Sequence, residues 1–189
     1  MRARQVLGRG CLFGGCVCLM AVALASVAFA QEQVSRESGE AQWIWTPDDA
    51  SVGYFRRVFY LSQPGDGQIA VTADKSYELY VNGRHVGSGQ NWRVMDSYDI
   101  VRYLVAGRNV IAIRAEGSAD GPRGLVARVT VRSAGGTFVS QSTGPGWKTA
   151  SNVNERWNWP SLNDQAWPAA KSLGEFGRTA PWGTDVRPA

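Results

Sequence analysis

The stretch KSYELYVNGRHVGSG, residues 75–89, decides how the chain folds. Its first half alternates apolar and polar side chains, which is typical of a strand with one buried face. Asn82-Gly83 follows, and a two-residue type I′ turn requires positive φ at both of those positions. RHVG then begins a return strand and places the single histidine, His85, near the tip. The side chains predicted to be buried in this hairpin are Tyr77, Leu79 and Val81.

Other stretches repeat the pattern of short strands separated by turn residues. YFRRVFYL (54–61) alternates apolar side chains with Arg56 and Tyr60, and GLVARVTVRS (124–133) alternates in the same way. Val110 to Ile113 is apolar on both faces, as expected for a strand inside a sandwich. Short strands with Gly/Pro turns, and no long amphipathic helix, predict an all-β fold. We expect an antiparallel β-sandwich of the jelly-roll kind.

The sequence also predicts one short helix and a tryptophan-rich core. Residues 164–171 are predicted to be helical, with Asp164 as the N-cap and Trp167 as a buried anchor. Trp43 and Trp45 are assigned to the core as well. Eight tryptophans occur in the chain. An exposed tryptophan offers a flat apolar face that can stack on a ring.

Residues 1–30 have the layout of a secretory signal peptide. Arginines come first, a mostly apolar run follows, and Ala-Phe-Ala gives a small-x-small ending at residue 30. A transmembrane anchor and lipid attachment at Cys16 are the alternatives. The strongly apolar run, from about Cys16 to Ala30, is shorter than the roughly 20 residues that span a bilayer. We therefore expect cleavage after Ala30.

Cleavage would leave a flexible linker over residues 31–41 and one β-sandwich domain over residues 42–189. All three cysteines would leave with the leader, so no disulfide, thiol nucleophile or cysteine metal site is expected. Of 20 Lys and Arg residues, 17 remain after loss of the leader's three arginines, against 16 Asp and Glu, a net charge of +1. These charges are interspersed, unlike the footprint of nucleic-acid binding. We expect a secreted or periplasmic protein with no nucleic-acid partner and no membrane contact after cleavage.

Five motifs occur in an order and spacing that resemble a known family. They are WIW (43–45), YFRRVFYL (54–61), ADKSYELYVNGRHVGSG (73–89), YDIVRYLVAGRNVIAIRAEG (98–117) and LNDQAWPAA (162–170). On these motifs the chain resembles the galactose-binding-domain-like jelly rolls that accompany glycoside hydrolases. It is similar to the N-terminal domain of bacterial α-L-rhamnosidases and to the sugar-binding domains of β-galactosidases and β-glucuronidases. The resemblance covers about residues 42–183.

The resemblance implies an accessory domain, either carbohydrate-binding or purely structural, that acts beside another secreted enzyme domain. Asp74 and Asp99 match fold-defining positions of the family, so the resemblance implies that they cap turns. Related jelly rolls often hold a structural calcium ion bound by loop oxygens. No Asp-x-Asp-x-Asp loop is visible in this sequence, so no calcium ligands are assigned, and no other cofactor is expected.

Loop tryptophans beside polar side chains are the candidates for a sugar site. A tryptophan ring can stack on the C–H face of a sugar while neighbouring polar side chains bond the hydroxyls. The residues expected to bind carbohydrate are Asn91, Trp92, Arg93, Glu155, Trp157, Asn158 and Trp159. The alternative is that these tryptophans cover the open ends of the sandwich.

The function expected from the sequence is a non-catalytic module that binds an oligo- or polysaccharide. The first rival is a structural accessory domain, which an exposed apolar patch of Trp157, Trp159 and Trp182 would favour. The second rival, a glycoside hydrolase, would need two carboxylates about 5–10 Å apart across one cleft. The available acids are Asp74, Asp96, Asp99, Glu116 and Asp120. His85 is assigned to the scaffold, because the sequence supplies neither a paired nucleophile nor a second histidine for a metal.

Overall fold

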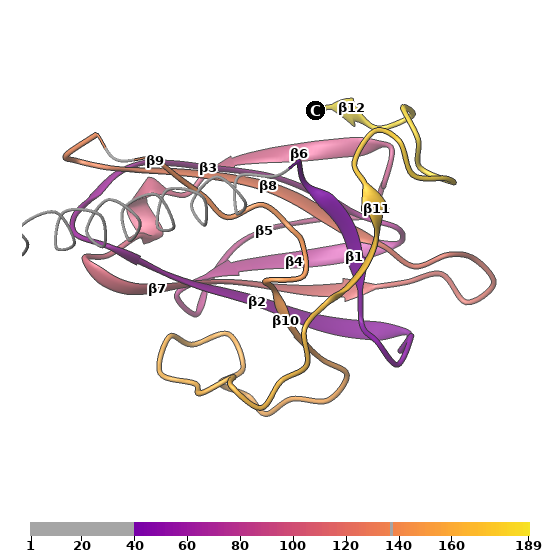
Figure 1. Ribbon diagram of the computed structural model, residues 1–189, viewed down its shortest axis with the longest axis horizontal. Helices are drawn as coiled ribbons and strands as arrows, with labels where there is room; N and C mark the ends of the chain where they lie inside the picture. The colour runs from indigo at the N-terminus through magenta and orange to yellow at the C-terminus, as the bar shows by residue number, and fades with distance from the viewer. Residues whose placement is uncertain (1–39, 137) are drawn as a thin grey trace, which may run out of the picture. The chain divides into compact units, whose positions relative to one another are not determined.

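Two β-sheets face each other across an apolar core in the computed structural model, which describes residues 40–136 and 138–189 (Figure 1). The expected all-β sandwich is confirmed. The predicted leader, residues 1–30, and all but the last two residues of the predicted linker lie outside the described residues. Ala41, at the end of that linker, is buried, and its carbonyl accepts a hydrogen bond from the Phe176 N–H at 2.8 Å.

Almost all strand pairs are antiparallel, and the exception is β12, which pairs parallel to β6. The seven-stranded sheet has the order β11-β1-β8-β3-β6-β12, with β9 beside β8. Its strands are β1 (Gln42–Trp45), β3 (Pro64–Ala73), β6 (Val94–Asp99), β8 (Leu125–Ser133), β9 (Phe138–Ser140), β11 (Lys171–Glu175) and β12 (Arg187–Pro188). The five-stranded sheet has the order β10-β2-β7-β4-β5. Its strands are β2 (Val52–Leu61), β4 (Ser76–Val81), β5 (Arg84–Gly89), β7 (Gly107–Glu116) and β10 (Lys148–Ala150).

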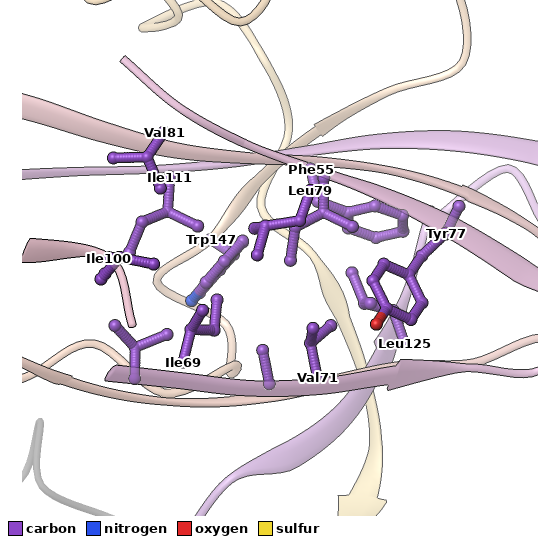
Figure 2. Close-up of a cluster of buried hydrophobic side chains, with 14 of the residues drawn as sticks. Phe55, Ile69, Val71, Tyr77, Leu79, Val81, Ile100, Ile111, Leu125 and Trp147 are labelled. Atoms are coloured by element: carbon purple, nitrogen blue, oxygen red, sulfur yellow. The ribbon is translucent and has the colours of Figure 1, made fainter. Parts of the chain in front are cut away.

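The core between the sheets follows from the alternation of side chains along the strands. Figure 2 shows Phe55, Leu79 and Ile111 from the five-stranded sheet reaching toward Ile69 and Val71 of the seven-stranded sheet. Each of these side chains is essentially inaccessible to solvent. Burial of a large aliphatic or aromatic side chain contributes about 1.5–3 kcal/mol. The apolar positions predicted in 54–61, 75–89 and 124–133 are therefore confirmed as part of the core.

A second apolar layer covers the outer face of the seven-stranded sheet. Trp43 points outward from β1, because its neighbour Ile44 points into the core. Trp182, from the segment after β11, stacks on Trp43 with ring centroids 4.2 Å apart and an interplanar angle of 15°. Gly124 permits this stack, since a Cβ there would lie 2.5 Å from the Trp182 ring. Trp43 and Trp45 are thus both buried as predicted, Trp43 in the outer cluster and Trp45 in the core cluster between the sheets.

The Asn82-Gly83 turn has the predicted geometry, with φ of 52° at Asn82 and 80° at Gly83. The Asn82 side chain also forms three hydrogen bonds. Its Nδ2 donates to the Tyr103 carbonyl at 2.9 Å and to Asn109 Oδ1 at 2.8 Å, and its Oδ1 accepts the Val110 N–H at 2.8 Å. The hairpin tip is therefore fastened to the start of β7 and to the 3₁₀ turn η1 (Val101–Tyr103).

The predicted helix at residues 164–171 is wrong, because that segment forms turns that lead into β11. Pro168 lacks the N–H that a helix would need and disfavours helical backbone at Trp167. The Trp167 N–H closes a single turn on the Asp164 carbonyl at 3.0 Å. In the described part of the chain, η1 is the one helical turn, and no helix is long and apolar enough to cross a membrane.

Asp74 and Asp99 cap turns, as the resemblance implied. Asp74 Oδ2 accepts the Ser118 N–H at 2.9 Å. Asp99 Oδ1 accepts the Val101 N–H at 2.9 Å, at the start of η1. Both carboxylates satisfy backbone donors in connections between strands.

Gly83→Ala is expected to lower the free energy of unfolding by about 1–2 kcal/mol, because an L-residue is strained at this positive φ. The new Cβ would also lie 3.1 Å from the Trp159 ring. Urea unfolding measures the change. Gly144→Ala is the matched control, since a Cβ there meets nothing within 4 Å and its φ is not positive. Equal stability of the two variants would contradict the role assigned to the turn.

Candidate functional site

One basic side chain holds the segment between β10 and β11, residues 151–170, against the outer face of the five-stranded sheet. We call this segment the arch (Figure 1). Arg56 follows the core residue Phe55 in β2, so its side chain points to the outer face of the sheet. It is nevertheless fully buried, because the arch covers it. Arg56 Nε donates to Asp164 Oδ2 at 2.9 Å. Its Nη1 donates to the carbonyls of Trp157 and Trp159, the latter at 3.2 Å.

Two further side chains from the same face donate to carbonyls of the arch. Arg108 Nη2 donates to the Leu162 carbonyl at 3.2 Å, and Lys148 Nζ donates to the Trp167 carbonyl at 3.1 Å. Burial lowers the pKa of Arg56, while the hydrogen bond to Asp164 opposes that effect. A guanidinium remains protonated in proteins even so. The arch is therefore positioned by charge-assisted hydrogen bonds, which fix its course over the sheet.

Trp157 anchors the arch from the other side of Arg56. Its ring packs edge-on against Tyr54 and Tyr80, with centroid separations of 5.0 Å and 5.7 Å, and only 8% of the residue is exposed. Burial raises the pKa of Tyr80 to about 12, and the hydrogen bond that its hydroxyl donates to Glu78 at 2.7 Å adds to the shift. Trp157 is thus part of the packing under the arch.

A hollow of about 380 Å³ opens where the end of the arch meets the β1–β2 turn and the residues after β10. Three separate chain segments therefore converge on it. The side chains used below are Thr46, Asp48, Thr149, Ser151, Asn152 and Trp167. A volume of this size is in the range of small-molecule sites.

The lining of the hollow combines an aromatic ring with polar groups. Trp167 is half-buried, with the Arg56 guanidinium 5.8 Å from its ring centroid. Hydrogen bonds from the Ser151 and Thr46 hydroxyls hold the pKa of Asp48 below its usual value. Thr149 is fully buried, and its Oγ1 has no hydrogen-bond partner among the described residues. The hollow thus offers a ring face from Trp167, an ionised acceptor from Asp48 and the exposed polar side chains of Ser151 and Asn152.

The seven residues predicted to bind sugar do not form one site, because the two loops lie on opposite outer faces of the sandwich. Trp92 packs against the buried cluster of Trp43 and Met95 outside the seven-stranded sheet. The Arg93 guanidinium lies 4.3 Å from the Trp92 ring centroid, so the ring already has a partner. Asn91 is exposed, and its Oδ1 accepts the Arg93 N–H at 3.1 Å within the turn.

The second predicted group belongs to the arch, over the five-stranded sheet. Glu155 is exposed and Trp157 is buried. Asn158 is 8% exposed, and its Oδ1 has no hydrogen-bond partner among the described residues. Trp159 is 48% exposed and rests against Gly83 at the hairpin tip. Trp159 is therefore the one tryptophan of this group with an accessible ring.

The exposed patch of Trp157, Trp159 and Trp182 does not form. Trp157 and Trp182 are 8% and 2% exposed, and they lie over opposite sheets. The reason is that each tryptophan covers an outer sheet face and is itself covered. The observation that would have favoured a purely structural module is thus absent from the described residues.

Sequence reasoning missed the hollow. The sequence pattern predicts that Trp167 is buried, and it gives no indication that Asp48 or Thr149 belongs to a site. The available signal was a tryptophan between polar residues in NDQAWP, together with the acidic turn TPDD. Nothing local indicates that these two stretches meet, because 118 residues separate Asp49 from Trp167.

The acids considered for hydrolysis are mostly engaged with neighbours. Asp96 accepts the Tyr77 hydroxyl at 2.6 Å. Glu116 accepts from Arg114 at 2.7 Å, which lowers the pKa of the glutamate, whereas a general acid needs a raised pKa.

Two carboxylates do share a hollow, of about 300 Å³. They are Asp66 and Asp99, which line it together with Arg132. Both are exposed, and Asp99 already accepts the Val101 N–H. The lining is mostly polar, unlike the apolar surroundings that a glycosidase builds around its general acid.

The part of the chain that the structure describes contains no assembled site for a metal ion or for catalysis by histidine. No group of three or more Asp, Glu, His or Cys side chains gathers there to hold a metal ion. The structural calcium ion that the resemblance allows therefore has no such cage among these residues. His85 is exposed and meets only the edge of Tyr80, at 5.3 Å, in keeping with the scaffold role expected of it.

Comparison with known proteins finds similarity to a glycosidase and to a lectin. The chain is 27% identical over 157 residues to an α-L-rhamnosidase of Streptomyces avermitilis, covering 76% of this chain and 15% of the relative. The crystal structure of that organism's α-L-rhamnosidase complexed with L-rhamnose matches with a TM-score of 0.71 and 27% identity, over 81% of this chain and 16% of the other. No family model matches the chain.

The Pleurotus ostreatus lectin in its apo form matches with a TM-score of 0.71 and 30% identity, over 77% of this chain and 44% of the lectin. The lectin in complex with GalNAc matches with a TM-score of 0.69 and 27% identity, over 76% and 46% of the two chains. The chain therefore spans less than a fifth of the rhamnosidase and less than half of the lectin. These similarities fit the galactose-binding-like module that the sequence motifs indicated.

Asp164→Ala is expected to lower the free energy of unfolding by about 3 kcal/mol, because it leaves the buried Arg56 guanidinium without its carboxylate. Urea unfolding followed by tryptophan fluorescence measures the loss. Asp185→Ala removes an exposed carboxylate that has no ion pair among the described residues, and should change stability by less than about 0.5 kcal/mol. A loss that small for Asp164→Ala would show that the arch does not depend on this pair.

Proposed function

We propose that this chain is a non-catalytic carbohydrate-binding module whose hollow beside Trp167 takes one sugar ring. The observation that carries the proposal is the hollow of about 380 Å³ in which Trp167 stands opposite polar groups from two other segments. A pyranose has an apolar C–H face and a rim of hydroxyls, so it needs both kinds of surface at once.

Each lining group has a definite role in this proposal. The Trp167 ring stacks on the C–H face of the sugar, with Arg56 fixing the position of the ring from within the protein. The Asp48 carboxylate accepts hydrogen bonds from sugar hydroxyls.

The comparisons support the class of ligand. One similar protein is a lectin seen with GalNAc, and another is an α-L-rhamnosidase seen with L-rhamnose. The match to a minor part of the rhamnosidase supports a domain without catalytic residues of its own. The alternative is a structural accessory domain that holds a neighbouring secreted enzyme and binds no sugar. A glycoside hydrolase remains the third reading.

The proposal includes export. Residues 1–30 act as a leader that is cleaved after Ala30, so that the β-sandwich, with its linker over residues 31–41, works in the periplasm or outside the cell. The mass of the protein recovered from periplasm or medium tests this directly. A mass that still includes residues 1–30 would contradict it.

Trp167→Ala is expected to weaken sugar binding by roughly tenfold or more, because the stacking face is lost. Asp48→Ala should weaken binding as well, through the lost acceptor. Calorimetric titration of the exported protein with L-rhamnose, galactose and GalNAc measures both. Trp92→Ala is the matched control, since Trp92 packs on the opposite outer face, and it should bind like the unaltered protein. Absence of binding to these sugars and to oligosaccharides that contain them would support the structural accessory domain instead. Release of reducing sugar from an oligosaccharide would support a glycoside hydrolase.

Binding in the hollow is expected to be constant from about pH 8 to about pH 5. Asp48 is the one titratable side chain among the lining residues, and its pKa lies below the ordinary value of 3.8. The carboxylate is therefore ionised throughout this range and becomes protonated only below it. Titrations at several pH values measure the affinity. A fall in affinity near pH 6 would indicate that another group controls binding.

A further inference from the structure

We propose that the tip of the β4–β5 hairpin is a second binding site, which holds the anionic groups of an acidic polysaccharide. This site is independent of the hollow beside Trp167, because it uses other residues and the opposite charge. Its elements are three exposed guanidiniums and two aromatic rings arranged around Asn82-Gly83. They come from the hairpin, from η1 and from the arch.

Two of the guanidiniums lie close to the same tyrosine ring. Arg84 and Arg102 each lie 4.8 Å from the Tyr103 ring centroid. Arg84 Nη1 donates to the Arg102 carbonyl at 3.2 Å, and Arg102 Nη2 donates to the Tyr103 hydroxyl at 2.6 Å. Contacts with a ring face and with fixed acceptors hold the two side chains in place. A ligand therefore meets guanidiniums that need little further ordering.

The third guanidinium lies on the other side of the hairpin tip. Arg156 is 5.5 Å from the ring centroid of Trp159, the most exposed tryptophan of the arch. Trp159 rests against Gly83, and Asn82 donates to the Tyr103 carbonyl. The tip is thus flanked by Tyr103 with two arginines and by Trp159 with one.

None of these three guanidiniums has a carboxylate within 4.0 Å among the described residues, although most ion pairs of the domain involve arginine. The nearest acids along the chain form no ion pair with these arginines: the Asp99 carboxylate accepts the Val101 N–H, and Glu155 is exposed with no ion pair among the described residues. Three like charges held in place without counter-charges favour an anionic ligand.

The chemistry of these groups selects carboxylate or sulfate on a sugar polymer. A guanidinium binds either anion through paired N–H donors. The exposed ring of Trp159 offers a stacking face beside the charges. A nucleic acid would call for a continuous basic stripe, whereas the charges outside the leader are interspersed and sum to +1.

The test compares binding of the exported protein to polygalacturonate, to dextran sulfate and to uncharged dextran by affinity electrophoresis. We expect retardation by at least one acidic polymer and none by dextran. Retardation by polygalacturonate alone would identify the carboxylate as the ligand group. Retardation by dextran sulfate alone would identify the sulfate ester. The triple variant Arg84→Gln, Arg102→Gln and Arg156→Gln should weaken that binding by about tenfold, since exposed ion pairs contribute little individually. Lysine at the same three positions should restore only part of the affinity, because an ammonium keeps the charge but lacks the paired N–H donors of a guanidinium.

The matched control removes three arginines from the outer face of the seven-stranded sheet, through Arg93→Gln, Arg128→Gln and Arg187→Gln. It changes the net charge by the same amount, so a loss of attraction to any polyanion would affect both triple variants equally. We expect the control to bind within twofold of the unaltered protein, and urea midpoints confirm that each variant folds. Equal weakening in the two variants, equal binding to DNA, or no binding to either acidic polymer would overturn the proposal. Sugar binding in the hollow is measured separately, so the two proposals fail independently.

Discussion

The buried guanidinium of Arg56 is the interaction on which the outer half of this molecule depends. A charge taken out of water is costly unless it is paired and fully hydrogen-bonded. The arch supplies Asp164 to Arg56 Nε and two backbone carbonyls to Nη1, so the segment that buries Arg56 also pairs its charge, while Nη2 has no hydrogen-bond partner among the described residues. Arg56 lies in the middle strands of the sheet, between Lys148 of β10 and Ala112 of β7. The arch is therefore held near its middle, through the Trp157 and Trp159 carbonyls and Asp164.

Both outer faces of the sandwich are covered by chain that follows the last long strand. The arch covers the five-stranded sheet, and the segment after β11 covers the seven-stranded sheet through the stack of Trp182 on Trp43. Tryptophan serves this purpose well because it buries a large area with few rotatable bonds. The tryptophans that remain at least partly exposed are Trp92, Trp159 and Trp167. Exposed tryptophan rings in the described domain are thereby confined to three places, and two of them, Trp159 and Trp167, are on the arch.

Two places on the arch present different chemistry, one at Trp159 in its middle and one at Trp167 near its end. Trp167 faces a hollow with one carboxylate and several hydroxyls, which suits a single neutral ring. Trp159 stands among arginines at the hairpin tip, which suits a repeated anionic group on an extended chain. Stability and recognition are linked here, since the hydrogen bonds that fold the arch onto β2 also position both rings. Scaffold side chains such as Asn82, with three hydrogen bonds at 2.8–2.9 Å, hold the surfaces that the ligands would meet.

The sequence by itself determined the strands, their buried faces and the Asn-Gly turn, because period-2 alternation and positive φ are local properties of the chain. It also determined the capping by Asp74 and Asp99 through motifs that match a family. It failed at residues 164–171, where the Asp164 carboxylate bonds to Arg56, 108 residues away, and Pro168 prevents a helix. It could not tell that Trp92 and Trp157 lie over opposite sheets, because side-chain pattern does not say which sheet a loop crosses. Only the tertiary structure brought Asp48, Thr149 and Trp167 to one hollow, because strand pairing and the buried Arg56 set the path of the arch.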